Sequence, residues 1–227
     1  MTRVAVFASG TGRTLRALLD AFPDRFSDQE VRVVLVVSNN PDAFVLERAR
    51  RAGVPAVVID HRRRPKEAFE ADLARAVDAC GATLICLAGF LRILSPWFIR
   101  RYRGRILNTH PALLPAFGGK GMYGERVHQA VLDAKVTVSG CTIHVVDEVP
   151  DGGPIMAQTA VPVLEDDTPS SLAARVQVEE RRLYPEVIRW WAGGRIELDG
   201  RRVILHPDGG SLPVSVPATR PPETLRA

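Results

Sequence analysis

The sequence predicts a doubly wound α/β fold with a mostly parallel sheet, extended by antiparallel strands in the C-terminal half. Over the first hundred residues or so, short apolar runs alternate with segments whose apolar residues recur at helical spacing. Further on, two apolar runs flank a tight turn at 151–154, which is typical of a hairpin. Because ligands of such folds gather at the carboxyl ends of the parallel strands, we look for function there.

The composition favours one domain that acts on small molecules. The chain has 227 residues, 46% of them hydrophobic, enough for one large core. We expect a catalytic domain over 1–205, with a phosphate-binding half at about 1–100 and a catalytic half at about 101–205. The proline-rich tail, 206–227, is expected to be draped or disordered. The net charge of +4 comes from dispersed arginines, which suit anionic small substrates rather than nucleic acid.

The cysteines and the apolar runs of the chain bear on its compartment and on its cofactors. The three cysteines have no C-x-x-C spacing, so neither a disulfide framework nor a metal site is expected. The amino end is too short for a signal peptide, and no apolar run approaches the roughly 20 residues that span a bilayer. We therefore expect a cytoplasmic protein with no membrane and no metal, and we leave a homodimer open.

The first strand, expected over 4–8, leads into the glycine loop Ser9-Gly10-Thr11-Gly12 and a helix with apolar residues at helical spacing from 15 to 22. Backbone N–H groups in such a loop, and the helix amino terminus behind it, attract anions, so a phosphate is expected there. The loop lacks the third glycine of the dinucleotide fingerprint, and NAD is therefore not expected.

The next elements continue the alternation. Strands are expected at 31–37, 56–59 and 84–87, with helices from Asp42, which would cap its helix, to near Gly53, and over about 67–80. Segment 88–96 is expected to be a loop with apolar anchors at the carboxyl end of a strand. The basic clusters 61–64 and 100–105 are expected to be solvated loops and helix ends.

The most informative stretch is I-L-N-T-H-P-A-L-L-P, residues 106–115. Its prolines end a short strand, so Asn108 and His110 lie at or just past its carboxyl end, and their spacing of two puts both side chains on one face. An amide donor beside an imidazole suits acyl transfer, since one stabilises an oxyanion and the other moves a proton. An isolated pair of this kind is more often a turn asparagine and a surface histidine.

The C-terminal half supplies a carboxylate. The glycine-rich segment 117–124 is expected to be a substrate-side flap, followed by a helix over 125–132. Strands at 138–146 and 155–163 flank the turn Asp151-Gly152-Gly153-Pro154. Thr168 is expected to cap a helix that Pro185 bends or breaks, and a hairpin is expected over 195–205. We expect His128 and His144 to be structural.

Several motifs in one order carry a resemblance. From about residue 3 to residue 204 the chain resembles the glycinamide ribonucleotide transformylase family of folate-dependent formyltransferases, through S-G-x-G, A-G-F-L-R-I-L, N-T-H-P-A-L-L-P, D-G-G-P-I and A-R-V-Q-V-E-E. The resemblance implies a Rossmann-like formyltransferase fold. It also implies transfer of a formyl group from the cosubstrate 10-formyltetrahydrofolate to the amine of 5'-phosphoribosylglycinamide in purine biosynthesis, without a metal.

The resemblance also implies roles for individual residues. Asn108 and protonated His110 would stabilise a tetrahedral oxyanion, while Asp151 would orient the imidazole and raise its pKa above about 6.5. The ribonucleotide would contact Gly12, Arg13, Thr14, Pro111 and Glu180. The folate would contact Lys66, Leu91, Arg92, Ile93, Leu94, Asn108, Asp147, Glu148, Val149, Pro150 and Asp151. As sequence alone, Glu180 is an exposed helix charge.

Two positions depart from the family pattern. Gly12-Arg13-Thr14 stands where the family has Gly-Ser-Asn, which keeps the backbone donors and adds a guanidinium. Lys66 stands where the family has an arginine near the folate, a similar charge without the planar fork.

Three other functions are weighed against this one. Methionyl-tRNA formyltransferase shares the Asn, His and Asp but resembles a longer chain with a carboxyl-terminal barrel, for which the roughly 20 residues after the last hairpin are too few. Formyltetrahydrofolate hydrolase has an extra amino-terminal domain, whereas this chain starts on its first strand. A non-catalytic nucleotide-binding module explains the glycine loop and leaves Asn108, His110 and Asp151 unexplained.

Overall fold

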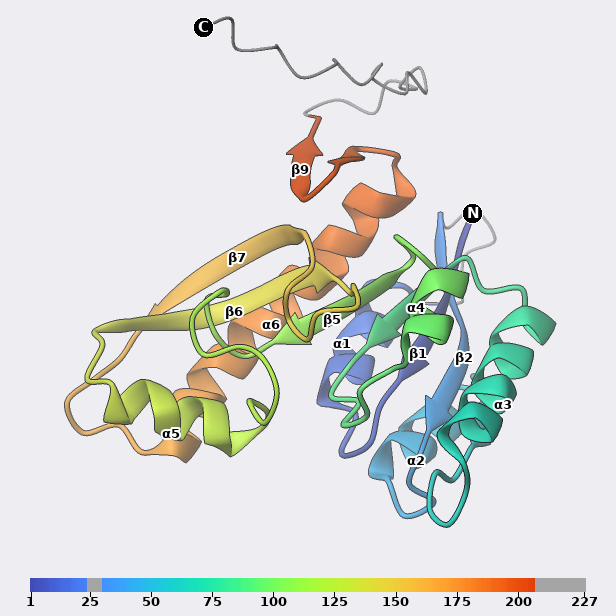
Figure 1. Cartoon of the computed structure of the whole chain (residues 1–227), viewed down its shortest axis with the longest axis horizontal. Coiled ribbons are helices and arrows are strands. Elements are labelled where there is room, and N and C mark those ends of the chain that lie inside the picture. Colours follow the sequence, from blue (N-terminus) through green and yellow to red (C-terminus); the bar gives the residue numbers. More distant parts are fainter. Residues whose placement is uncertain (24–29, 207–227) are drawn as a thin grey trace, which may run out of the picture.

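The computed structural model describes residues 1–23 and 30–206, so the expected tail at 207–227 lies outside the described residues. A seven-stranded sheet has the order β3-β2-β1-β4-β5-β6-β7 (Figure 1). Five strands run parallel: β1 (Thr2–Phe7), β2 (Val31–Ser38), β3 (Ala56–Val58), β4 (Leu84–Leu87) and β5 (Ile106–His110). The last two strands are β6 (Val138–Val145), which runs antiparallel to β5, and β7 (Ile155–Pro162), which runs antiparallel to β6. The predicted fold class is confirmed.

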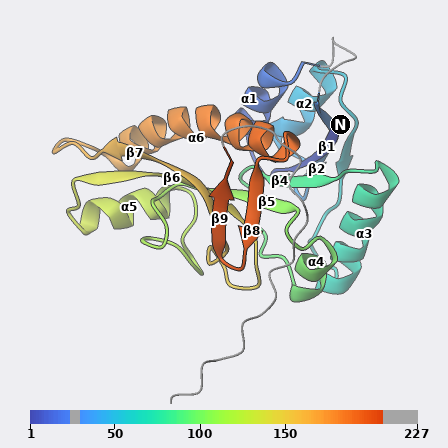
Figure 2. The ribbon, with the colours of Figure 1, turned by 90° about the horizontal axis from the view of Figure 1, so that it is seen from above.

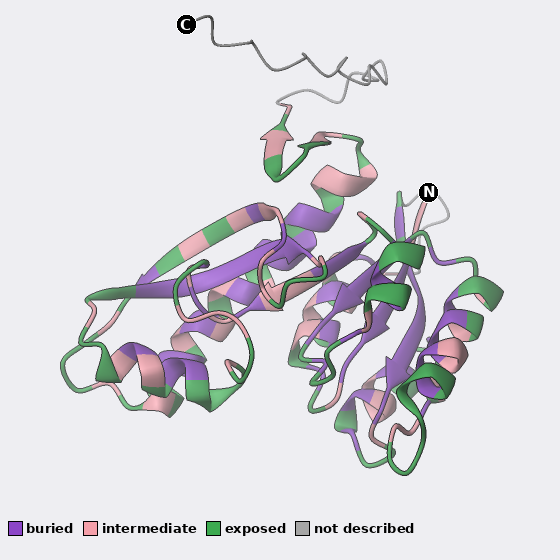
Figure 3. Ribbon diagram, in the orientation of Figure 1, coloured by how far each residue is buried: buried purple, intermediate pink, exposed green. Residues whose placement is uncertain are grey.

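Helices cover both faces of the sheet. One face carries α1 (Arg13–Ala21), α2 (Phe44–Arg51) and α6 (Pro169–Ala192), and the other carries α3 (Lys66–Ala79) and α4 (Pro96–Arg101) (Figure 2). The short α5 (Glu125–Asp133) packs against α6. The central strands are therefore buried over most of their length (Figure 3), which explains why they read as continuous apolar runs rather than alternating ones.

The strand order places the functional end of the sheet. From β1 the chain adds β2 and then β3 on one side, and it crosses back to add β4 on the other side of β1. The loops that follow β1 and β4 therefore diverge between these two neighbouring strands. They remain joined by a hydrogen bond of 3.0 Å from Ser9 N–H to the Gly89 carbonyl. The carboxyl ends of β1, β4 and β5 thus open together.

Two helix starts differ from the sequence prediction. Asp42 does not cap α2. The Asp42 N–H donates to Asn40 Oδ1 at 3.1 Å, and Ala43 is the N-cap. Val45 N–H donates to the Gly10 carbonyl at 3.1 Å, so the glycine loop supplies a hydrogen-bond partner to this helix end. Helix α4 was not predicted, although Ser95 accepts a hydrogen bond from Phe98 N–H and Pro96 stands at the first position.

The C-terminal elements are one long helix and a hairpin. A bend or a break was predicted at Pro185, and the break does not occur, because α6 is continuous over 24 residues. Proline removes one helical hydrogen bond, but Tyr184, Val187 and Ile188 around it are fully buried, and the Tyr184 hydroxyl donates to the Leu107 carbonyl at 2.9 Å. The predicted hairpin is confirmed as a separate two-stranded sheet, β8 (Ile196–Asp199) and β9 (Arg202–Leu205).

Candidate active site

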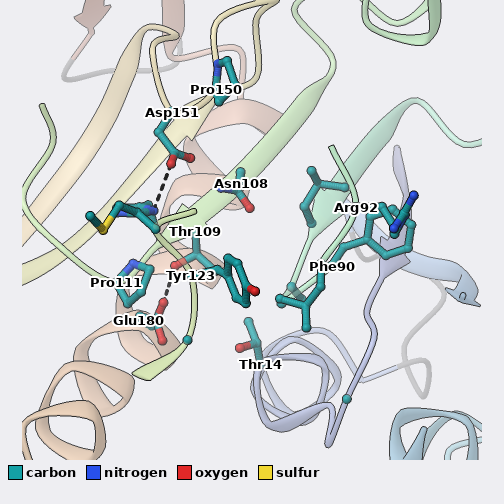
Figure 4. Close-up of a pocket in the computed structure, with 18 of the residues that line it drawn as sticks. Thr14, Phe90, Arg92, Asn108, Thr109, Pro111, Tyr123, Pro150, Asp151 and Glu180 are labelled. Atoms are coloured by element: carbon teal, nitrogen blue, oxygen red, sulfur yellow. Dashed lines mark hydrogen bonds and ion pairs between the residues drawn. The ribbon is translucent and has the colours of Figure 1, made fainter. Parts of the chain in front are cut away.

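A cavity of about 670 Å³ opens at the carboxyl ends of the parallel strands. Its walls come from the glycine loop, the segment after β4, the end of β5, the loop before α5, the β6–β7 connection and α6. Figure 4 shows Asn108 and Thr109 of β5 between Asp151 and Glu180, with Thr14 and Phe90 from the first half of the chain facing them. The site is therefore assembled from both halves of the chain.

One end of the cavity is built to hold an anion. Gly12 has φ of 70°, and a Cβ there would lie 2.9 Å from Val45 Cα, so only glycine fits. No side chain caps α1, and within the described residues the N–H groups of 13–15 have no hydrogen-bond partner. Arg13 Nη1 donates to Gln177 Oε1 at 3.0 Å at the rim. A phosphate would meet free N–H groups, a helix amino terminus and a guanidinium.

A second wall of the cavity suits a flat heterocycle. Leu91 and Ile93 are each 58% exposed, which is unusual for large apolar side chains, and both line the cavity. Leu91 N–H donates to Ser9 Oγ at 2.9 Å, but the N–H groups of 92–94 have no partner among the described residues. Apolar side chains beside free backbone donors can hold a ring by its faces and its edges.

Asn108 is held by His144, its register partner across β5 and β6. His144 Nδ1 lies 3.0 Å from the Val145 carbonyl, which can only accept, so we assign the proton to Nδ1. His144 Nε2 lies 3.1 Å from Asn108 Nδ2 and 3.6 Å from Asp151 Oδ1. The contact with Asn108 fixes the orientation of the amide and leaves its second N–H for a ligand.

His110 stands between two oxygen acceptors. Its Nε2 donates to the Phe117 carbonyl at 2.8 Å, and its Nδ1 lies 3.4 Å from Asp151 Oδ2. The same Asp151 oxygen accepts from Gly119 N–H at 2.9 Å. Segment 117–119 therefore contacts both His110 and Asp151, and residues 119 and 121–124 line the cavity; the substrate-side flap stays a prediction.

The direction of the His110 pKa corrects the sequence prediction. Burial lowers the pKa of His110 below its ordinary value, and this outweighs the charge of Asp151 and the Phe117 carbonyl, which both raise it. The ring is only 3% exposed, a property that the sequence did not reveal. Burial also opposes ionisation of Asp151, but His144, His110 and the Gly119 N–H together hold the pKa of that carboxyl below its usual value.

Glu180 is not the exposed helix charge that the sequence alone indicates. It lies on the face of α6 that closes the cavity and is 8% exposed, and its Oε1 accepts from Thr109 Oγ1 at 2.7 Å. Burial raises the pKa of this carboxyl above its ordinary value. A buried carboxylate with one neutral partner is suited to a cationic or amine group of a ligand.

Most of the expected site residues line this cavity, and two do not. Lys66 begins α3 and places its Nζ 3.9 Å from Glu70 Oε1. Val149 is 59% exposed and is not among the residues that line the cavity. Asp147 and Glu148 line the cavity, but their carboxylates also pair with Arg201 at 3.6 Å and Arg100 at 3.1 Å.

Sequence reasoning missed three polar side chains of the cavity. Thr109 bonds Glu180, and His144, expected to be structural, bonds Asn108. His128, expected to be structural as well, lines the cavity at 3% exposure, and its Nδ1 has no partner within the described residues. Pairing β6 against β5 from the sequence would have found His144, since it lies opposite Asn108.

In residues 1–23 and 30–206, no group of three or more His, Cys, Asp or Glu side chains could hold a metal ion. No helix of the same residues is long and apolar enough to cross a membrane.

Comparison with known proteins places these observations in a family. Residues 2–188 match the family described as formyl transferase. Phosphoribosylglycinamide formyltransferase of Escherichia coli is 38% identical over 92% of this chain and 95% of its own length. The trifunctional purine biosynthetic protein adenosine-3 of Drosophila melanogaster is 44% identical over 85% of this chain, which spans only 14% of that protein. The crystal structure of glycinamide ribonucleotide transformylase 1 from Symbiobacterium toebii matches with a TM-score of 0.84 and 45% identity, over 91% of this chain and 94% of that one.

Proposed function

The chain belongs to the formyl transferase family, and on that premise we propose that it transfers a formyl group from 10-formyltetrahydrofolate to the amine of 5'-phosphoribosylglycinamide, a step of purine biosynthesis. The observation that carries the proposal is the convergence of Asn108, His110 and Asp151 in one cavity that also holds an anion-binding helix terminus. An amide, an imidazole and a carboxylate meet the needs of acyl transfer, and the helix terminus meets those of a phosphorylated acceptor.

The shape of the cavity supports an assignment of substrate parts. The ribonucleotide phosphate binds at Gly12, Arg13 and Thr14, and its amine reaches the buried carboxylate of Glu180 beside Pro111. The pterin ring of the folate binds along the backbone of 91–94, where the N–H groups of 92–94 have no partner among the described residues. The formyl group then lies between the two substrates, against Asn108 and His110. Residues 1–205 form the catalytic unit in this proposal.

The chemistry follows from these positions. The uncharged amine attacks the formyl carbon, a C–N bond forms, and the carbonyl electron pair moves to oxygen. The free N–H of Asn108 and a ring N–H of His110 donate to this oxyanion. A proton leaves the attacking nitrogen through water toward Asp151. The bond between the formyl carbon and the folate nitrogen then breaks as the carbonyl re-forms, and the same proton passes through water to the leaving nitrogen.

His110 can act only after a local rearrangement. Both of its ring nitrogens face protein oxygens, so donation to the substrate requires the Phe117 carbonyl to release Nε2. The charge that develops on the oxyanion favours the imidazolium, which offsets the effect of burial on the His110 pKa. Asp151 keeps the ring oriented throughout. We propose that substrate binding moves segment 117–119.

The test is to offer three formyl acceptors to the purified protein: glycinamide ribonucleotide, methionyl-tRNA and water. The proposal expects formyl transfer to the ribonucleotide only. Transfer to tRNA, or release of formate at a comparable rate, would assign the protein to one of the alternative activities. We also propose that it acts in the cytoplasm, where its three free cysteines would remain reduced.

A further inference from the structure

A second cavity, of about 660 Å³, lies outside the substrate pocket between α1, α2 and α6. These three helices share one face of the sheet (Figure 2). Only one carboxylate, Asp20, is among the residues that line this cavity. Six arginines line it, and we call it the arginine groove: Arg13, Arg16, Arg48, Arg181, Arg182 and Arg189.

The arginine groove is continuous with the phosphate end of the substrate pocket. Arg13 and Arg181 line both cavities. Arg13 follows Gly12 directly and opens α1, while Arg181 follows the buried Glu180 on α6. A phosphate that moves along the groove therefore arrives at the free N–H groups of the glycine loop without leaving guanidinium contact.

Most of these guanidiniums are not neutralised within the described residues. Arg48 donates to the Thr11 carbonyl at 2.8 Å and Arg13 to the Gln177 amide oxygen, both uncharged acceptors. Arg189 lies 5.2 Å from the centre of the Phe22 ring. The structure describes no hydrogen bond or ion pair of Arg181.

Two arginines do have ion pairs, and both guanidiniums are exposed to solvent. Arg16 lies 2.8 Å from Asp20, and its side chain is 65% exposed. Arg182 lies 4.0 Å from Glu179, and its side chain is 80% exposed. Exposed pairs of this kind exchange partners at little cost, so both guanidiniums remain available to an incoming anion.

We propose that the arginine groove is a phosphate-capture site, which binds the dianionic phosphate of the ribonucleotide from solution and passes it to the glycine loop. This inference rests on the proposed function. A cleft lined by charges of one sign raises the local concentration and the association rate of a ligand of opposite sign, and salt weakens this effect. Guanidinium and phosphate also form paired, charge-assisted hydrogen bonds. Because none of residues 91–94 lines the groove, the folate should not depend on it.

The test is a double variant, Arg16→Gln with Arg182→Gln. Both side chains line the groove, and neither lines the substrate pocket. The matched control is Arg51→Gln with Arg75→Gln, which also removes two exposed arginines from helical ion pairs, on α2 and α3, but leaves the groove intact. Steady-state kinetics for both substrates are measured from low to high ionic strength.

The groove variant is expected to lower kcat/KM for the ribonucleotide by roughly 3- to 10-fold at low ionic strength and to flatten its salt dependence. Its kcat at saturation and its folate KM should equal those of the wild type. The control should keep the wild-type salt dependence. An unchanged salt dependence in the groove variant, or equal effects of both double variants, would overturn the proposal.

A binding measurement separates capture from general surface charge. Inorganic phosphate is titrated into the wild-type protein while NMR follows the Nε–H signals of the arginines. Saturable shifts at Arg16 and Arg182 are expected, and shifts confined to Arg13 would refute the capture site. If no formyl reaches the ribonucleotide in any protein, the proposed function fails; normal transfer with an unchanged salt dependence refutes the groove alone.

Discussion

The substitution Asp151→Asn tests the coupling between the carboxylate and the imidazole. Asp151 Oδ2 lies 3.4 Å from His110 Nδ1, and its charge raises the His110 pKa against the larger effect of burial. Asparagine keeps the shape and can still accept from Gly119 N–H, but it removes the charge. The His110 pKa should therefore fall further below its ordinary value.

The size of the effect follows from titration. Above its pKa, the charged fraction of an imidazole falls tenfold for each pH unit, so at neutral pH every unit lost from the His110 pKa removes ninety percent of the remaining imidazolium. Together with the loss of orientation, kcat at neutral pH should fall by roughly 10²-fold or more, the usual scale for a general acid.

Two assays check this prediction. NMR titration of His110 gives the midpoint, and steady-state kinetics gives kcat against pH. Asp147→Asn is the control, because Asp147 belongs to the same loop and pairs with Arg201 rather than with a histidine. An unchanged His110 midpoint in Asp151→Asn, or equal losses in the two variants, would refute the reasoning.

Further predictions concern binding and stability. Arg13→Ser should raise the ribonucleotide KM several-fold and leave the folate KM unchanged, since Arg13 lines the phosphate end; an effect on the folate alone would place Arg13 elsewhere. Arg201→Ala should raise the folate KM about 2- to 5-fold, because Arg201 holds Asp147 and the Gly152 carbonyl. Arg202→Ala on the same hairpin should not, and equal kinetics of the two variants would contradict this. Burial lowers the pKa of His128, and the charge of His110 lowers it further. The stabilisation of the fold by neutral His128 is therefore fully present above the unfolded pKa of about 6.5, and it is lost as pH falls through the lowered folded pKa. Urea unfolding of His128→Gln should therefore show a smaller loss of stability on acidification than the wild type, and an identical loss would contradict it.

The sequence predicted the frame of the fold because its signals are local. Apolar runs marked the buried strands, and the glycine loop marked the turn where Gly12 approaches Val45. The spacing of Asn108 and His110 placed both at the end of β5, where they line the cavity. Helix α4 was missed although Ser95 and Pro96 carry a local start signal.

What the sequence could not reveal depends on contacts between distant segments. The burial of His110 comes from the strands and loops packed around it, and this reversed the expected direction of its pKa. Glu180 is buried because α6 turns that face to the cavity and Thr109 reaches it from β5. Lys66 misses the cavity because it begins α3 beside Glu70.

The central claim is that Asn108 and His110 catalyse formyl transfer to the ribonucleotide amine. The most direct measurement follows a ¹³C-formyl label from 10-formyltetrahydrofolate by NMR in the wild type, Asn108→Ala and His110→Ala, with saturating ribonucleotide. The label should appear in the amide of the ribonucleotide, and its rate of transfer should fall by roughly 10²-fold or more in each variant while the fold is kept. Label that appears only in formate, or a near wild-type rate in either variant, would contradict the claim.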